Sequence, residues 1–182
     1  SPDAPWMGQM SLPRELSVHG GRLYQTPVRE IDAMRCNKVV HKQISFTDTI
    51  RLEGIKGRCI DMELTLRRGD SQVLYQKFAV RFAQNDTYHT ALSFRPRESI
   101  LKIDRKFSGS RRAIIHQRRS LVNSTDGSLK LRIILDRFSA EVFVNDGEQV
   151  LTATMYTDQT ADGISFFADG TVEMDVVKYD LL

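Results

Sequence analysis

The residue types that carry most enzyme chemistry occur in this chain, but their spacing does not assemble a catalytic or metal site. The histidines are His19, His41, His89 and His116, and no two are spaced as ligands on one helix or strand. The sequence also lacks a Cys-x-x-Cys pair, a Gly-rich phosphate loop, a Gly-x-Ser-x-Gly elbow and a helix–loop–helix calcium loop. We therefore expect no metal and no other cofactor.

Carboxylates are plentiful, and residues 129–156 hold Asp136, Glu141, Asp146 and Glu148. Most acidic residues alternate with apolar residues or lie at turns. That pattern is typical of the solvated face of an antiparallel sheet rather than of a general acid–base pair. We therefore expect a solvated surface here.

Positive charge is densest at Lys106, Arg111, Arg112, Arg118 and Arg119. Such a group can contact phosphate on a nucleic acid or a sugar. The net charge is only +3 and aromatic residues are not interleaved with the cations, which disfavours nucleic acid. A basic loop paired with neighbouring carboxylates is the favoured interpretation.

Aromatic residues are the other candidates for contact with carbohydrate. Trp6, Tyr24, Tyr75 and Tyr88 are each able to stack on a sugar ring, but packing on strand faces explains most of them better.

Composition describes one globular domain. The chain has 182 residues, of which 27% are ionisable, and its apolar runs are too short to cross a membrane. Cys36 and Cys59 are interpreted as free thiols, although a disulfide between them stays open. Because the chain begins with Ser1 and has no signal peptide, we expect it to be a piece of a longer protein.

Residues 129–156 predict the clearest structure, three consecutive strands. Apolar residues recur at every second position of residues 129–135 and again of residues 140–144. The sequence Asn145-Asp146-Gly147 suits the tight turn before the third strand, residues 149–156.

The rest of the chain predicts further strands and one helix. A hairpin is expected at residues 15–18 and 22–26, and a helix at residues 27–35, where Pro27 suits a first turn. The expected strands are residues 39–46, 59–66, 73–82, 88–94, 100–105, 113–117, 163–168 and 171–181. A turn is expected at Asp169-Gly170 and a bulge near Val176-Val177.

Short strands separated by turns indicate an all-β antiparallel sandwich or barrel. The strands are too many for one flat sheet, so two packed sheets with one short helix near the N-terminus are expected.

Four blocks, in order, then show a resemblance to glycoside hydrolase family 32, the invertases, sucrose-6-phosphate hydrolases, inulinases and levanases. Residues 6–16, WMGQMSLPREL, resemble the stretch that leads out of the catalytic propeller of that family, and residues 25–31, QTPVREI, resemble the next. Residues 103–109 resemble a third block, and residues 131–148, LRIILDRFSAEVFVNDGE, are most similar to the family.

The resemblance implies a two-part enzyme. Residues 1–14 would connect a missing N-terminal five-bladed β-propeller to residues 15–182, a C-terminal antiparallel β-sandwich of the concanavalin/lectin-like jelly-roll type. The family's nucleophile, its transition-state stabilising Asp and its acid/base Glu lie in motifs that this sequence lacks, since no Asp precedes Pro and no Glu precedes Cys. The parent protein would be a retaining glycosidase acting on sucrose, sucrose 6-phosphate or fructans, and we expect this chain alone to be inactive.

The implied role is support of the propeller, which is the expected partner. Trp6, Met7, Met10 and Leu12 are the candidate docking residues. Neither nucleic acid nor membrane is expected as a partner, whereas carbohydrate and a homo-oligomeric contact stay open. The alternatives are a carbohydrate-binding module and an unrelated interaction domain. Low cysteine content favours the cytoplasm, although members of the family are also secreted.

Overall fold

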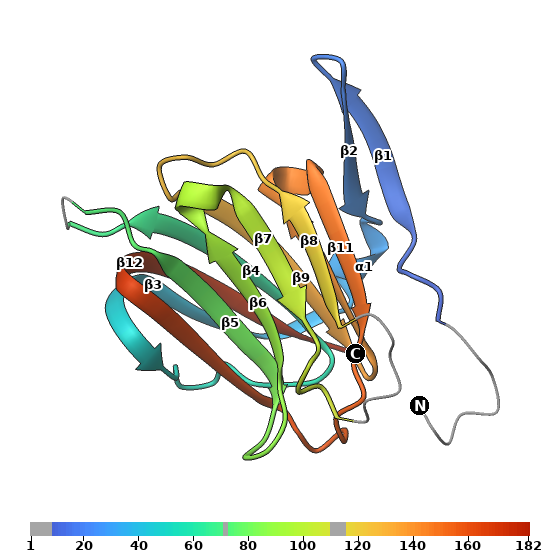
Figure 1. Ribbon diagram of the computed structural model, residues 1–182. Helices are drawn as coiled ribbons and strands as arrows, with labels where there is room; N and C mark the ends of the chain where they lie inside the picture. The colour runs from blue at the N-terminus through green and yellow to red at the C-terminus, as the bar shows by residue number, and fades with distance from the viewer. Residues whose placement is uncertain (1–8, 71–72, 110–115) are drawn as a thin grey trace.

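The computed structural model describes residues 9–70, 73–109 and 116–182. Ten of its strands form one antiparallel network that folds into two layers (Figure 1). Layer A contains β5 (Lys77–Gln84), β6 (Thr90–Arg95), β7 (Ile100–Asp104) and β8 (Gln117–Leu121). Layer B contains β4 (Ile60–Arg68), β9 (Leu129–Asp136), β10 (Ser139–Val144) and β11 (Gln149–Thr154).

Two long strands join the layers. The first half of β12 (Gly163–Leu181) pairs with β5, its second half pairs with β4, and β3 (Arg35–Ile50) lies along both halves. Apolar side chains of both layers meet between them in one core, which includes Met62, Phe82, Phe94 and Ile133. The expected all-β antiparallel sandwich is confirmed.

Several expected elements differ from the observed ones, and β3 extends beyond the expected residues 39–46 at both ends. The helix α1 spans only Glu30–Ala33, because Pro27 ends β2 opposite Arg14 and Arg35 already enters β3. Strand β5 begins at Lys77 rather than at residue 73, because Tyr75 turns into the core, where its hydroxyl donates to the carbonyl of Gly127 at 2.7 Å. Strand β8 covers Gln117–Leu121, and most of the strand expected at 113–117 lies outside the described residues.

The turn expected at Asp169-Gly170 is instead a bulge inside one continuous strand. The register between β12 and β3 shifts there, from Ala168 opposite Asp48 to Val172 opposite Phe46. Gly170 has a φ of +92°, and a Cβ on it would come within 2.9 Å of the Cα of Tyr75. Gly170 is therefore required by the close approach of Tyr75 and by the positive φ of the bulge, although in the sequence it suggested a turn.

The bulge expected near Val176-Val177 falls close to a real irregularity. The pairing with β3 shifts between Met174 and Val176, which face Ile44 and His41. The extra residue belongs to β3, where Gln43 has a φ of +53°. Val177 turns away from the core because the strand simply alternates.

The loop after β11 is held by a buried arginine. The guanidinium of Arg58 is 8% exposed and donates to the carbonyls of Arg137, Thr157, Asp158 and Ala161. It ties residues 157–161 to the turn between β9 and β10.

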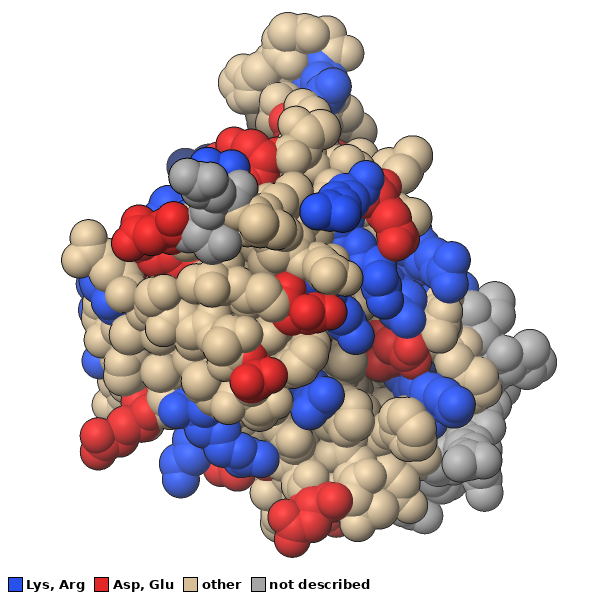
Figure 2. All heavy atoms as spheres, turned by 60° about the vertical axis from the view of Figure 1, so that its left-hand side comes forward, with Lys and Arg blue, Asp and Glu red and all other residues tan. Residues whose placement is uncertain are grey.

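The N-terminal strands β1 (Arg14–His19) and β2 (Arg22–Pro27) form the expected hairpin, which stands out from the sandwich (Figure 1). Its projecting end, at the top of Figure 2, is nearly free of charged side chains. Gly147, in the short η2 turn (Asn145–Gly147), fixes its base. A Cβ on Gly147 would come within 2.2 Å of the carbonyl oxygen of Gln25, so the hairpin approaches the sandwich as closely as a backbone allows.

Candidate functional site

The outer face of layer B is covered by the N-terminal segment of the chain rather than by solvent. Ile31 of α1 packs with Ile134 of β9 and Phe143 of β10 in a second apolar cluster. The half-buried residues around this cluster are Leu12, Val28, Val150 and Leu181. Leu12, Val28 and Ile31 of the N-terminal segment therefore pack against the sandwich.

A buried carboxylate lies at the centre of this covered face. Asp61 of β4 is 0% exposed, and it accepts hydrogen bonds from Arg35 at 2.8 Å and from Arg132 at 2.6 Å and 3.0 Å. Arg132 also donates to Asp32 of α1 at 2.6 Å. Burial alone would lower the pKa of Arg132, but the hydrogen bonds and the charge of Asp61 outweigh burial, so the pKa of Arg132 is raised. The network joins α1, β3, β4 and β9.

Glu141 of β10 makes a second buried link to the N-terminal segment. It is 2% exposed, its carboxylate is 2.9 Å from the guanidinium of Arg14, and it accepts a hydrogen bond from the backbone of Leu12. The expectation of a solvated surface is therefore wrong for Glu141 and for Asp61. Both face outward from the core, but chain from the N-terminus packs over them.

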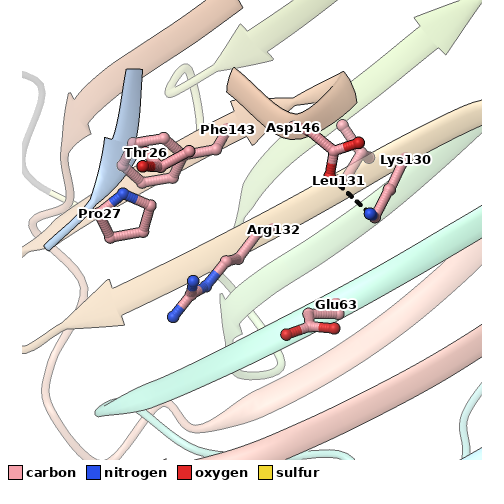
Figure 3. Close-up of a pocket in the computed structure, with 8 residues that line it drawn as sticks. All are labelled: Thr26, Pro27, Glu63, Lys130, Leu131, Arg132, Phe143 and Asp146. Carbon is pink, nitrogen blue, oxygen red and sulfur yellow. Dashed lines mark hydrogen bonds and ion pairs between the residues drawn. The ribbon is translucent and has the colours of Figure 1, made fainter. Parts of the chain in front are cut away.

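Beside this network lies a cavity of about 160 Å³. Figure 3 shows its walls, with Thr26 and Pro27 from β2, Phe143 from β10 and three residues of β9. Its lining residues are Thr26, Pro27, Glu63, Lys130, Leu131, Arg132, Phe143 and Asp146.

Each carboxylate of the cavity already has a cation. Asp146 accepts from Lys130 at 2.5 Å, and Glu63 accepts from Arg35 at 2.7 Å. A retaining glycosidase needs two carboxyl groups about 5–5.5 Å apart, one of them free to attack the sugar. Carboxylates held by arginine and lysine suit structural cohesion better than nucleophilic attack. In the part of the chain that the structure describes, no three acidic, His or Cys side chains group as metal ligands.

The candidate docking residues fall in different environments. Trp6 and Met7 lie outside the described residues. Met10 is 96% exposed, whereas Leu12 is half-buried in the cluster of Ile31, Ile134 and Phe143. Leu12 thus contacts the sandwich itself, whereas Met10 is exposed.

The candidate stacking aromatics are scattered. Tyr75 is 1% exposed in the core, and burial raises its pKa. Tyr24 packs near His19 with ring centroids 5.6 Å apart, and Tyr88 is 41% exposed at the turn before β6. Trp6 lies outside the described residues. These residues form no common platform for a sugar among the residues described.

The basic loop is only partly described, since Arg111 and Arg112 lie outside the described residues. Lys106, Arg118 and Arg119 form no ion pair with any described carboxylate, so the expected pairing is not found for them.

The cysteines are free, with Cys36 near the carbonyl of Asp180 and Cys59 near the carboxylate of Asp136. Within the described ranges no helix is long and apolar enough to cross a bilayer.

The sequence is similar to parts of longer, curated proteins. Among curated relatives, the sucrose-6-phosphate hydrolase of Staphylococcus xylosus is 29% identical over 178 residues, covering 97% of this chain and 35% of the relative. The levanase of Bacillus subtilis (strain 168) is 29% identical over 177 residues, covering 92% of this chain and 26% of the relative. The chain therefore spans about a third or less of the length of these relatives.

Solved structures share the fold. An exo-inulinase from Aspergillus awamori matches 100% of this chain and 37% of its own, with a TM-score of 0.82 at 22% identity. A sucrose-6-phosphate hydrolase from Lactobacillus gasseri matches 93% of this chain and 33% of its own, with a TM-score of 0.75 at 24% identity. The family model described as glycosyl hydrolases family 32 C terminal matches residues 30–181. With the two-layer antiparallel sandwich, this match shows that the chain belongs to the C-terminal domain family of the family 32 glycoside hydrolases.

Proposed function

We propose that this chain is the non-catalytic C-terminal sandwich of a retaining β-fructofuranosidase-type glycosidase that hydrolyses sucrose, sucrose 6-phosphate or fructans. The names of its relatives, a sucrose-6-phosphate hydrolase and a levanase, support that substrate range. The occupied carboxylates on the outer face of layer B support a non-catalytic role. The domain stabilises an N-terminal catalytic propeller, and residues 1–14 are the connecting segment.

One observation carries the docking role, the apolar face of the projecting hairpin. Leu16, Val18 and Leu23 are 65%, 67% and 50% exposed. Val18 pairs with Leu23, and Leu16 lies two positions before Val18, so the three side chains share one face. Met10 lies four residues before β1 and is 96% exposed. A protein surface that leaves such residues uncovered is typical of an interface.

We expect the catalytic domain to cover this face. The hairpin is anchored at its base, where Arg14 donates to Glu141 and to Thr152 of the sandwich, each at 2.9 Å. An anchored hairpin presents a preformed surface, so little ordering cost opposes docking. Trp6 and Met7 belong to the same proposed interface, and oligomerisation stays a separate prediction.

Replacing the three hairpin residues by threonine tests the proposal, because threonine keeps the strand propensity but removes most of the apolar area. In the isolated chain, L16T/V18T/L23T should shift Tm by no more than about 2 °C, since the side chains are exposed. In the parent protein the variant should lower the free energy of unfolding by about 2–4 kcal/mol and shorten the half-life of activity at elevated temperature.

The matched control is Leu121→Thr, which removes a side chain that is 71% exposed on β8, a strand that does not pair with the hairpin. It should leave the parent protein unchanged. The docking role fails if the triple variant of the parent protein is as stable as this control.

A further inference from the structure

The outer face of layer A carries a second cavity, of about 150 Å³, for which the proposed function has no use. Its floor consists of small side chains from two neighbouring strands, Ala79 of β5 and Ala91 and Ser93 of β6. Ala79 lies directly opposite Ser93 in the antiparallel register. Small residues set among longer neighbours leave a hollow in the sheet surface. We call this hollow the layer A groove.

Long cationic side chains surround the floor. Lys77 and Arg81 lie two positions before and after Ala79 on β5, so they project from the same face of the sheet. Lys102 of β7 lies opposite Ser93 and closes a third side. In Figure 2, Lys and Arg side chains gather on the right-hand part of the visible face, with acidic side chains between them.

Only one of these cations has an acidic partner among the described residues. Lys102 donates to Asp104 at 3.2 Å. The same carboxylate also accepts from the side chain of Gln117 at 2.8 Å and from the backbone of Lys106 at 2.9 Å. Asp104 also acts on Lys77 across the groove, but its single negative charge offsets only part of the positive charge of Lys77, Arg81 and Lys102.

Lys77 and Arg81 flank the floor, and neither forms an ion pair with a described carboxylate. The ammonium of Lys77 lies 5.8 Å from the ring centroid of Phe167, and the side chain of Arg81 forms no hydrogen bond with a described residue. Burial and the positive charges of Arg95, Lys102 and Arg81 lower the pKa of Lys77. The groove thus holds charge repulsion that a bound anion would relieve.

An aromatic wall stands at one end of the groove. Phe107 is 46% exposed, and its ring centroid lies 5.7 Å from that of His89, which also lines the cavity. Burial and the charge of Arg81 lower the pKa of His89, so its ring is neutral at pH 7 and carries one N–H donor. An apolar wall beside cations suits an anionic group attached to a small carbon skeleton.

We propose that the layer A groove binds a compact dianion, a phosphate group either free or as the monoester of a small polyol. Lys77, Arg81 and Lys102 converge on the anion, and Ser93 lies beneath it. Several oxygens on one centre allow two or three cations to bind at once, which a neutral sugar does not. Phe107 would contact the polyol of an ester.

Calorimetric titration of the purified chain tests this directly. The probes are inorganic phosphate, glucose 6-phosphate and glucose, in buffer free of other multivalent anions. We expect saturable binding of phosphate and no binding of glucose. Tighter binding of glucose 6-phosphate than of phosphate would identify an ester site, and equal binding would identify a site for the phosphate group alone. Absence of saturable binding for both phosphates would overturn the proposal.

Two variants assign the binding to the groove. Lys77→Met and Arg81→Met keep the apolar stems of these half-buried side chains and remove their charges. Each should weaken phosphate binding at least about tenfold, the loss expected for one charge-assisted hydrogen bond. Without phosphate, neither variant should have a lower Tm than the unmodified chain, because repulsion within the groove is reduced.

Lys42→Met is the matched control, since Lys42 is an exposed lysine of β3 that does not line the groove. It should bind phosphate with unchanged affinity. Unchanged affinity in both groove variants, or an equal loss in the control, would contradict the assignment.

Discussion

Arg58→Ala should lower the free energy of unfolding by about 3–5 kcal/mol, as much as truncating a buried core side chain. The guanidinium donates to Asp158, Ala161 and the hydroxyl of Thr157, each at 3.3 Å. It also donates to the carbonyls of Thr157 and Arg137. Removal leaves several buried carbonyl oxygens without a donor and opens a cavity. Urea unfolding followed by circular dichroism measures the loss.

Arg58→Lys should recover only a small part of this stability. A single ammonium cannot reach the carbonyls on both sides of the loop, which the planar fork of arginine spans. The matched control is Arg137→Ala, because that side chain is exposed and should matter by no more than about 0.5 kcal/mol. An Arg58→Ala variant within about 1 kcal/mol of the unmodified chain would contradict this description of the loop.

Asp61→Ala should cost about 2–4 kcal/mol, because it leaves the half-buried Arg35 and Arg132 without the carboxylate that they share. The effect should also reach α1, since Asp32 joins the network through Arg132. Hydrogen exchange should therefore become faster in α1 and in the base of the hairpin than in the core of β9. Circular dichroism and hydrogen exchange on one sample test both statements.

The control for Asp61 is Glu173→Ala. Glu173 also accepts from an arginine, with 2.6 Å to Arg67, but its side chain is 29% exposed and that of Arg67 is 36% exposed. A solvated pair of this kind contributes no more than about 1 kcal/mol. Equal losses for Asp61→Ala and Glu173→Ala would show that the covered network does not hold the N-terminal segment in place.

The strands of the sandwich could be predicted from sequence because their cause is local. In β9 and β10, alternate side chains enter one core, and this requirement leaves a period of two in the residue types. The hairpin turn also has a local cause, because Gly20 and Gly21 both adopt the positive φ that suits a tight turn.

What covers a polar face cannot be predicted from the same pattern. Asp61 and Glu141 alternate with core residues as surface carboxylates do, and nothing near them in sequence indicates burial. Their partners lie far away along the chain, since Arg14 and Glu141 are separated by 127 residues. The only local signal was the group of apolar residues before β1, and that group was expected to dock on the missing propeller.

The layer A groove depends on register, which the sequence also leaves open. Lys77, Arg81 and Lys102 meet because β5, β6 and β7 pair with Ala79 opposite Ser93 and Ser93 opposite Lys102. A shift of one residue would turn either strand's cations to the other face. The densest basic run in the sequence therefore did not indicate where the proposed anion-binding groove lies.

The most direct test of the account is whether the purified chain of 182 residues hydrolyses fructosides. Release of reducing sugar should be measured with sucrose, sucrose 6-phosphate, inulin and levan, each at a concentration that saturates related enzymes. We expect rates equal to those of the protein-free blank, because the described carboxylates of the covered face and its cavity are each paired with a cation. Turnover at an enzyme-like rate, about 1 per second or faster, would contradict it.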